Sequence, residues 1–196
     1  MENYDLYVRN QTEINKKKLD RVFEYKENIQ MLSEYLKNKT SKIEFGLCHG
    51  TRRGKEQEWF KKYLGNDVKI LGTEISDTAT QFPDTIQWDF HKIKDEWINN
   101  VDFIYSNSLD HSYDIKFCIQ QWIKCLKKGG ICIINCSTGH SSLSCGKADI
   151  SAFSKKNLVE LIDRDTKEVE VIDVLKGKKK KWYYLTWDYV IGRKFE

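Results

Sequence analysis

The stretch VDFIYSNSLDH, from Val101 to His111, decides how the rest of the sequence is interpreted. Its first six residues, Val101 to Ser106, are mostly apolar and β-branched or aromatic, which predicts a strand. The polar residues Asn107 and Ser108 follow directly, and Leu109, Asp110 and His111 come next. In an open α/β sheet, ligands bind where the parallel strands end. The stretch therefore predicts a strand with a ligand site at its carboxyl end.

Short apolar runs alternate with helical patterns on both sides of this stretch. We predict strands at Ile43–Leu47, Val68–Ile75, Thr85–Trp88, Val101–Ser106 and Ile131–Cys136, and a final antiparallel pair at Val169–Leu175 and Trp182–Ile191. We predict helices at Leu19–Leu36, Lys55–Leu64, Ile93–Ile98, Tyr113–Leu126 and Lys155–Asp163, a loop or short helix at Ser76–Pro83, a turn at Lys127–Gly130 and a loop at Ser137–Ser151. Such alternation is typical of parallel strands joined by crossover helices, so we expect a doubly wound, mostly parallel α/β sheet with helices on both faces.

Length and composition favour one globular domain. The chain has 196 residues, 40% of them hydrophobic and 13% aromatic, which allows one packed core but not two. We interpret residues 1–18 as a flexible or loosely docked arm and residues 19–196 as a single Rossmann-like domain. No apolar run approaches the roughly 20 residues of a membrane span, and the N-terminus has no signal-peptide core. We therefore expect a cytoplasmic protein that does not enter membranes.

Six cysteines and a net charge of +4 limit the other functional classes. Cys132 and Cys136 have no second Cys or His pair elsewhere in the sequence that would complete a zinc site, so we expect reduced core thiols and no metal. Two lysine runs, Lys16–Lys18 and Lys178–Lys181, carry much of the positive charge. We interpret the second run as a solvated hairpin tip, because a nucleic-acid surface usually adds a basic stripe with interleaved aromatics.

Several polar or charged residues directly follow predicted strands. Glu74 ends the second strand, about two dozen residues after the first glycine turn, where an acid contacts ribose hydroxyls in nucleotide-binding sheets. Asp89 follows the third strand. The glycines of the first turn, Gly46, Gly50 and Gly54, are spaced too widely for the G-x-G-x-x-G dinucleotide pattern. Gly46 is equally consistent with a close-packed strand position.

Taken in order, five segments resemble the class I S-adenosylmethionine-dependent methyltransferase family. The resemblance spans Lys42 to Cys136, about half the chain. Its five segments are Glu44–Gly54, Ile70–Ser76, Gln87–Phe90, Val101–His111 and Leu126–Ile134. The chain departs from the family pattern at His49, where a glycine is usual, and at Lys128, where a proline is usual.

The resemblance implies S-adenosyl-L-methionine as the cofactor and assigns its contacts. Glu74 would bind the ribose hydroxyls, Asp89 would accept the adenine amino group, and Phe90 would pack on the ring. Arg52 or Arg53 is a candidate partner for the methionine carboxylate or for an acidic substrate. The implied cofactor-binding set is Gly46, Cys48, His49, Gly50, Thr51, Arg52, Glu74, Ile75, Asp89, Phe90, Ser106, Asn107 and Ser108.

Methyl transfer is an in-line displacement, and a hydroxyl acceptor must also lose a proton. His111 and His140, in loops after neighbouring strands, are the candidate general bases, and Asp110 is a candidate to orient either. The structural alternatives are that His111 caps a helix or packs under the cofactor, and that Asp110 is simply an acid at a helix start.

The sequence favours a small polar acceptor, such as a sugar hydroxyl or a biosynthetic intermediate, and it leaves the oligomeric state open. One alternative is a nucleic-acid methyltransferase that uses Lys178–Lys181. Another is a non-catalytic partner protein that binds S-adenosylmethionine. A nicotinamide oxidoreductase ranks lowest, because the chain lacks a glycine loop that would face a pyrophosphate.

Overall fold

Seven strands form one mixed sheet in the computed structural model, which describes residues 4–137, 151, 153–178 and 187–195. The strands stand in the order β3-β2-β1-β4-β5-β7-β6. β7 is antiparallel to both of its neighbours, β5 and β6, and the other described strand pairs are parallel. The strands are β1 Phe45–His49, β2 Lys69–Glu74, β3 Thr85–Gln87, β4 Val101–Ser106, β5 Leu126–Asn135, β6 Val169–Lys176 and β7 Asp188–Lys194. The predicted doubly wound sheet with a late antiparallel strand is confirmed.

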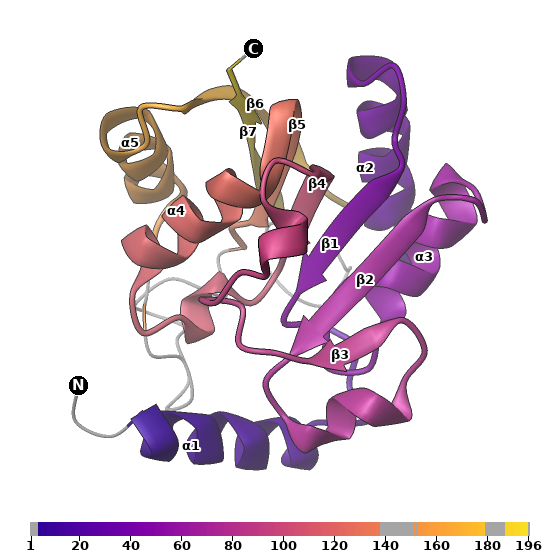
Figure 1. Cartoon of the computed structure of the whole chain (residues 1–196), viewed down its shortest axis with the longest axis vertical. Coiled ribbons are helices and arrows are strands. Elements are labelled where there is room, and N and C mark those ends of the chain that lie inside the picture. The colour runs from indigo at the N-terminus through magenta and orange to yellow at the C-terminus, as the bar shows by residue number, and fades with distance from the viewer. Residues whose placement is uncertain (1–3, 138–150, 152, 179–186, 196) are drawn as a thin grey trace.

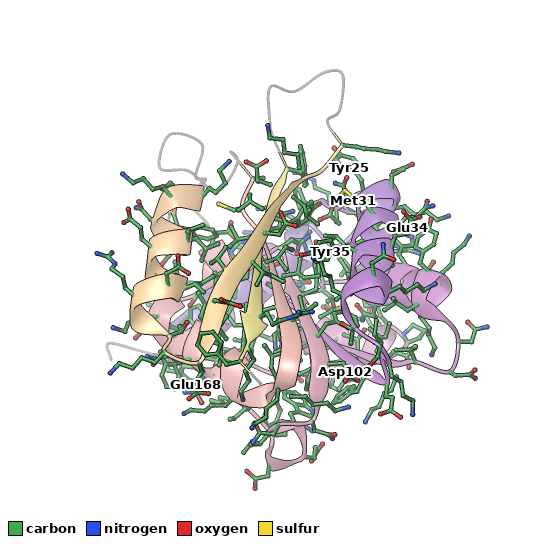
Figure 2. All side chains as sticks on the ribbon, turned by 90° about the horizontal axis from the view of Figure 1, so that it is seen from above. Tyr25, Met31, Glu34, Tyr35, Asp102 and Glu168 are labelled. Atoms are coloured by element: carbon green, nitrogen blue, oxygen red, sulfur yellow. The ribbon has the colours of Figure 1, made fainter. Side chains whose placement is uncertain are left out.

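Helices cover both faces of this sheet (Figure 1). α2, Lys26–Lys39, and α3, Lys55–Leu64, lie on one face, and α4, Ile115–Cys125, and α5, Lys155–Asp165, lie on the other. Strand residues alternate between two apolar cores, so Phe103 and Tyr105 face α2 and α3 while Ile104 faces α4. Seen from above, Met31 and Tyr35 lie between α2 and the sheet (Figure 2). This two-sided burial explains why the central strands are apolar almost throughout.

The strand order reverses between β1 and β4. From β1 the chain crosses one face to β2 and β3, and then returns to β4 on the other side of β1. Loops that leave β1 and β4 therefore diverge and open a crevice at the carboxyl ends of these strands, which is where ligands bind in sheets of this kind. At the opposite end, Asp102 accepts hydrogen bonds of 2.8 Å from the backbone N–H groups of Glu44 and Phe45.

Residues 4–17 form a helix, α1 Tyr4–Lys17, rather than a flexible or loosely docked arm. Figure 1 shows this helix lying across the ends toward which β1 and β2 point. Its polar side chains anchor it: Lys16 pairs with Asp77 at 2.9 Å, and the Asn15 side chain accepts a hydrogen bond of 3.2 Å from Thr78. This segment has few apolar residues, so the helical spacing of apolar positions does not reveal it. A helix held by polar contacts is therefore difficult to predict from that spacing.

The second helix begins at Lys26 rather than at Leu19, and it ends at Lys39. The segment between α1 and α2 is held over the loop that follows β1. Arg52 and Arg53 donate to the carbonyl oxygens of Arg21 and Asp20, at 3.4 and 3.3 Å. These contacts hold the segment before Lys26 in a non-helical path.

Three further boundaries differ from the prediction. The helix expected at Ile93–Ile98 is a single 3-10 turn, Asp95–Trp97. The turn expected at Lys127–Gly130 is part of β5, in which Gly129 has a positive φ of 73° and the pairing with β4 is irregular. The last strand begins at Asp188, and residues 179–186 of the expected hairpin lie outside the described residues.

Candidate functional site

A pocket lies between α1 and the carboxyl ends of the parallel strands. Four loops line it: Gly50 and Arg52 after β1, Glu74 and Ile75 at the end of β2, Asp89 and Phe90 after β3, and Ser108 and His111 after β4. α1 lines it with Tyr7, Gln11, Ile14 and Asn15. The structure thus brings together eight of the residues that the sequence singled out.

The turn after β1 requires a glycine at position 50. Gly50 has a φ of 71°, and its N–H donates to the carbonyl of Thr73 at 2.8 Å. A Cβ at this position would lie 2.5 Å from the Cβ of Ser108. The loops of β1 and β4 therefore approach closely at this wall of the pocket, where a side chain would push them apart.

Glu74 is held by backbone donors. Its Oε2 accepts from the N–H of Arg52 and its Oε1 from the N–H of Ser76, both at 3.0 Å. Burial raises the pKa of Glu74, although these backbone hydrogen bonds oppose the shift. A carboxylate has about four acceptor sites, so two hydrogen bonds leave capacity for the hydroxyl groups of a ligand.

Asp89 is the centre of a buried hydrogen-bond network. Its Oδ1 lies 2.7 Å from Nδ1 of His91, and Nε2 of His91 lies 2.8 Å from the hydroxyl of Ser112. Its Oδ2 accepts from the hydroxyl of Tyr4 at 2.8 Å. Because a carboxylate only accepts, the Nδ1 of His91 carries the proton that it shares with Asp89. Burial favours a higher pKa for Asp89, but the hydrogen bonds from His91 and Tyr4 prevail and lower it.

Phe90 and His111 also line the pocket. The indole N–H of Trp122 donates to the carbonyl of Phe90 at 2.8 Å, which holds the backbone of this loop against the core. His111 is half-buried, and its backbone carbonyl accepts from the hydroxyl of Tyr7 at 3.2 Å. Trp97 and Trp122 are fully packed in the core.

The other predicted site residues do not line the pocket. Gly46 lies inside β1 under the ring of Phe103. Cys48 and His49 are buried in the same strand, where His49 stacks on Trp122 and its burial lowers its pKa to about 3. Thr51, Ser106 and Asp110 are also buried, Asn107 is half-buried, and His140 lies outside the described residues.

Sequence reasoning missed the contribution of α1. Its pocket residues Tyr7, Gln11, Ile14 and Asn15 are spaced i, i+4, i+7 and i+8, which is one face of a helix. This spacing was available in the sequence, but two of the four residues are polar, so the apolar pattern is weak. The role of His91 in positioning Asp89 was missed as well.

Several remaining predictions concern features away from the pocket. Cys48, Cys118, Cys125, Cys132 and Cys136 are buried thiols that form no disulfide. Within the described residues, no group of three or more His, Cys, Asp or Glu side chains is arranged to hold a metal ion. No described helix is both long and apolar enough to span a membrane. Lys178 donates its backbone N–H to Asn28 at 2.7 Å, and Lys179–Lys181 lie outside the described residues.

Comparisons with known proteins identify the architecture. The 1,6-didemethyltoxoflavin-N1-methyltransferase of Burkholderia thailandensis, solved with bound 1,6-didemethyltoxoflavin and S-adenosylhomocysteine, superimposes with a TM-score of 0.73 over 99% of this chain and 90% of its own, at 14% identity. The N-methyltransferase NodS of Bradyrhizobium japonicum, solved with S-adenosylhomocysteine, gives 0.68 over 95% of this chain and 100% of its own, at 11% identity.

This chain has the class I methyltransferase fold. No protein-family model and no curated protein sequence matches it, so the fold is established by structure alone. The fold does not fix the reaction, because the [4+2]-cyclase SpnF also superimposes on it, with a TM-score of 0.64 over 85% of this chain and 80% of its own, at 13% identity. In this methyltransferase fold the pocket of Glu74 and Asp89 lies at the edge where ligands bind.

Proposed function

We propose that the protein is an S-adenosylmethionine-dependent methyltransferase acting on a small polar acceptor. One observation carries the proposal: Glu74 and Asp89, from two different strand ends, line a single pocket beside the Gly50 turn. Had the two carboxylates lain on different edges of the sheet, an adenosine could not contact both.

The chemistry of the pocket fits this cofactor. S-adenosylmethionine offers hydroxyl and amino donors and a positively charged sulfonium, which carboxylates complement. Glu74 has free acceptor capacity for the ribose hydroxyls, and Asp89 for the adenine amino group, even with His91 and Tyr4 bound. Phe90 supplies an apolar wall for the ring. Arg52 extends from the Gly50 turn and is the candidate partner for a carboxylate.

The residues of the chain have distinct roles in this proposal. The cofactor supplies an electrophilic methyl group, which is transferred by an in-line displacement. Glu74 and Asp89 orient the adenosine, and α1 excludes water from it through Tyr7 and Ile14. His111 is the candidate base for an acceptor that must lose a proton, because it lines the pocket beside Ser108. Asp110 is buried in the same turn, directly before His111, and is the candidate to orient it.

The acceptor that we propose is a small molecule, either a sugar hydroxyl or a biosynthetic intermediate. The similar fold from Burkholderia thailandensis holds a small heterocycle, 1,6-didemethyltoxoflavin, together with S-adenosylhomocysteine. α1 also narrows the access of a large substrate to the strand ends. A nucleic-acid acceptor predicts strongly salt-dependent binding of oligonucleotides, and a non-catalytic binding protein predicts cofactor affinity without turnover.

Isothermal titration calorimetry tests the proposal. S-adenosylmethionine and S-adenosylhomocysteine are titrated into the wild type, Glu74→Gln and Glu58→Gln. Glu58→Gln is the matched control, because Glu58 is an exposed acid on α3 that pairs with Lys55 and does not line the pocket. We expect both ligands to bind the wild type and Glu58→Gln, and Glu74→Gln to bind each at least about tenfold more weakly. Equal affinity for all three proteins would remove the ribose assignment.

A further inference from the structure

A second buried polar cluster lies beside the pocket, on the face of the sheet that α2 and α3 cover. Its acids are Glu24, from the segment between α1 and α2, and Glu56, from the first turn of α3. Asn107 follows β4, and Asn135 ends β5. Glu24 and Glu56 are 2% and 5% exposed, and Asn135 is 2% exposed. No step of the proposed reaction uses these residues.

Glu24 is surrounded by hydrogen-bond donors. The hydroxyls of Tyr105 and Tyr189 and the side-chain amides of Asn28 and Asn135 all donate to its carboxylate. The backbone N–H of Tyr25 also donates to it, at 2.7 Å. None of the four side-chain partners carries a charge, and no cation among the described residues forms an ion pair with Glu24.

Glu56 adds a second buried acid to the cluster. Its Oε1 accepts from the side-chain amide of Asn107 at 3.2 Å. Burial raises the pKa of Glu56 to about 7, and the charge of Glu24 contributes in the same direction. The nearest cation, Arg52, is turned toward the backbone of Arg21 and lies over the ring of Phe23 at 4.9 Å.

Asn135 shows that the cluster lacks a donor. Its Nδ2 donates to Glu24 at 3.1 Å, whereas its Oδ1 is buried and has no hydrogen-bond partner. The amide cannot be turned over, because its oxygen would then face the Glu24 carboxylate. A buried acceptor without a partner is costly. A group that donates hydrogen bonds would remove this cost.

The cluster is connected to the pocket through the loop after β4. Ser108, which lines the pocket, has its hydroxyl 3.0 Å from the carbonyl of Gly50 and 3.1 Å from Oδ1 of Asn107. Asn107 is only half-buried, and its amide contacts Glu56. Asn107 therefore joins the cluster to the pocket wall at Ser108.

We propose that Glu56, Asn107 and Asn135 bind a protonated amino group of the methyl acceptor, with Glu24 behind them. The inference rests on the proposed methyltransferase function and narrows its acceptor to a molecule that carries an amino group. The protonated group serves recognition, because a protonated nitrogen has no lone pair with which to accept a methyl group. A sugar hydroxyl has one donor and no charge, whereas a protonated amine offers up to three donors and a charge opposite to that of the two acids. An anionic acceptor would be repelled.

The test uses ethylammonium chloride as the probe and ethanol as an uncharged probe with the same heavy-atom shape. Each is titrated at constant ionic strength into isotopically labelled protein saturated with S-adenosylhomocysteine, and the side-chain amide signals of Asn107 and Asn135 are followed by NMR. For a ligand of three heavy atoms we expect a dissociation constant on the order of 1 mM or weaker. Ethanol should bind at least about tenfold more weakly.

Glu56→Gln and Glu58→Gln form the matched pair of variants. Glu58 lies two residues further along the same helix, is 58% exposed at its side chain, and pairs with Lys55. Glu56→Gln should weaken ethylammonium at least about tenfold, and Glu58→Gln should leave it unchanged. The comparison of ethylammonium with ethanol in the wild type tests the inference without relying on either variant.

The outcomes separate the inference from the function on which it rests. If S-adenosylhomocysteine does not bind the wild type, the proposed function fails. If it binds but ethylammonium shifts neither amide, or shifts them no more than ethanol does, the amine site alone is overturned. A third outcome is that Glu56→Gln loses affinity for S-adenosylhomocysteine while the wild type binds no ethylammonium. That result would assign the cluster to the ammonium group of the cofactor and would overturn the inference.

Discussion

The hydroxyl of Tyr4 donates a 2.8 Å hydrogen bond to the carboxylate of Asp89, 85 residues further along the chain. The bond joins the first turn of α1 to the loop after β3, beside the pocket that Asp89 lines. Tyr4 thus contacts the same carboxylate that we assign to the adenine. Opening of α1 and access to this part of the pocket are therefore coupled.

Tyr4→Phe should loosen α1. A hydrogen bond to a charged group contributes about 1.5–3 kcal/mol when it is buried, and less here because the bond is partly exposed. We expect amide hydrogen exchange in α1 to accelerate by about tenfold, and S-adenosylhomocysteine to dissociate several-fold faster in a stopped-flow displacement. Tyr63→Phe, on α3 and against the other core, is the control. Unchanged exchange in α1 would show that Tyr4 does not hold the helix.

Asp89 should make the protein sensitive to acid. Its pKa is lowered in the folded state, so its contribution to stability is present above the ordinary aspartate pKa of 3.8 and is lost as the pH falls through the folded value. We expect Asp89→Asn to lower the free energy of unfolding at pH 7 by about 1–3 kcal/mol, and the difference from wild type to shrink toward pH 3. Urea denaturation at several pH values measures both. A difference independent of pH would contradict the assignment.

Glu56 should make the folded protein less stable as the pH rises, whereas Asp89 makes it less stable as the pH falls. Its folded pKa of about 7 lies above its ordinary value of 4.5, so the folded state binds the proton more tightly and stability falls as the pH rises from 4.5 through 7. Glu56→Gln should therefore be more stable than wild type at pH 8, by on the order of 3 kcal/mol at most, and similar to it at pH 4.5. Glu58→Gln should match wild type at both. Equal stabilities of the wild type and Glu56→Gln at pH 8 would show that burial does not penalise this acid.

Gly46→Ala and Gly50→Ala should separate packing from binding. An added Cβ at Gly46 overlaps the Phe103 ring, so we expect a loss of about 1–3 kcal/mol in unfolding free energy, with the affinity of the folded protein for S-adenosylhomocysteine unchanged. Gly50→Ala combines a positive φ with a clash against Ser108 in the pocket wall, so both stability and affinity should fall. Calorimetry and thermal melting of the same samples measure the two effects. Weaker binding in Gly46→Ala would assign Gly46 to the cofactor.

The sheet could be predicted because its strands are buried on both faces and therefore have clear apolar runs. β4 has the predicted bounds, Val101–Ser106, and so does α3, Lys55–Leu64. Helices held by polar contacts were harder to predict. α1 is fixed by Asn15, Lys16 and Tyr4 rather than by an apolar stripe, and the start of α2 depends on how Arg52 and Arg53 hold the preceding segment.

The candidate site was predictable where one residue directly follows a strand. Glu74 and Asp89 line the pocket because the ends of parallel strands share an edge of the sheet. Successive side chains of a strand point to opposite faces of the sheet. Gly46 and Cys48 lie within β1 and face the core under α2 and α3, so they do not line the pocket. The pairing of Asn135 with Glu24 joins residues 111 positions apart. No local pattern contains such a pairing.

The position of α1 bears on how the protein should be prepared. A purification tag fused before Tyr4 would lie next to the contact between α1 and Asp89. β7 runs against the parallel strands, and it therefore delivers Lys194 to the opposite edge of the sheet. A tag fused beyond Lys194 would lie away from the pocket, and ligand titrations should use that arrangement.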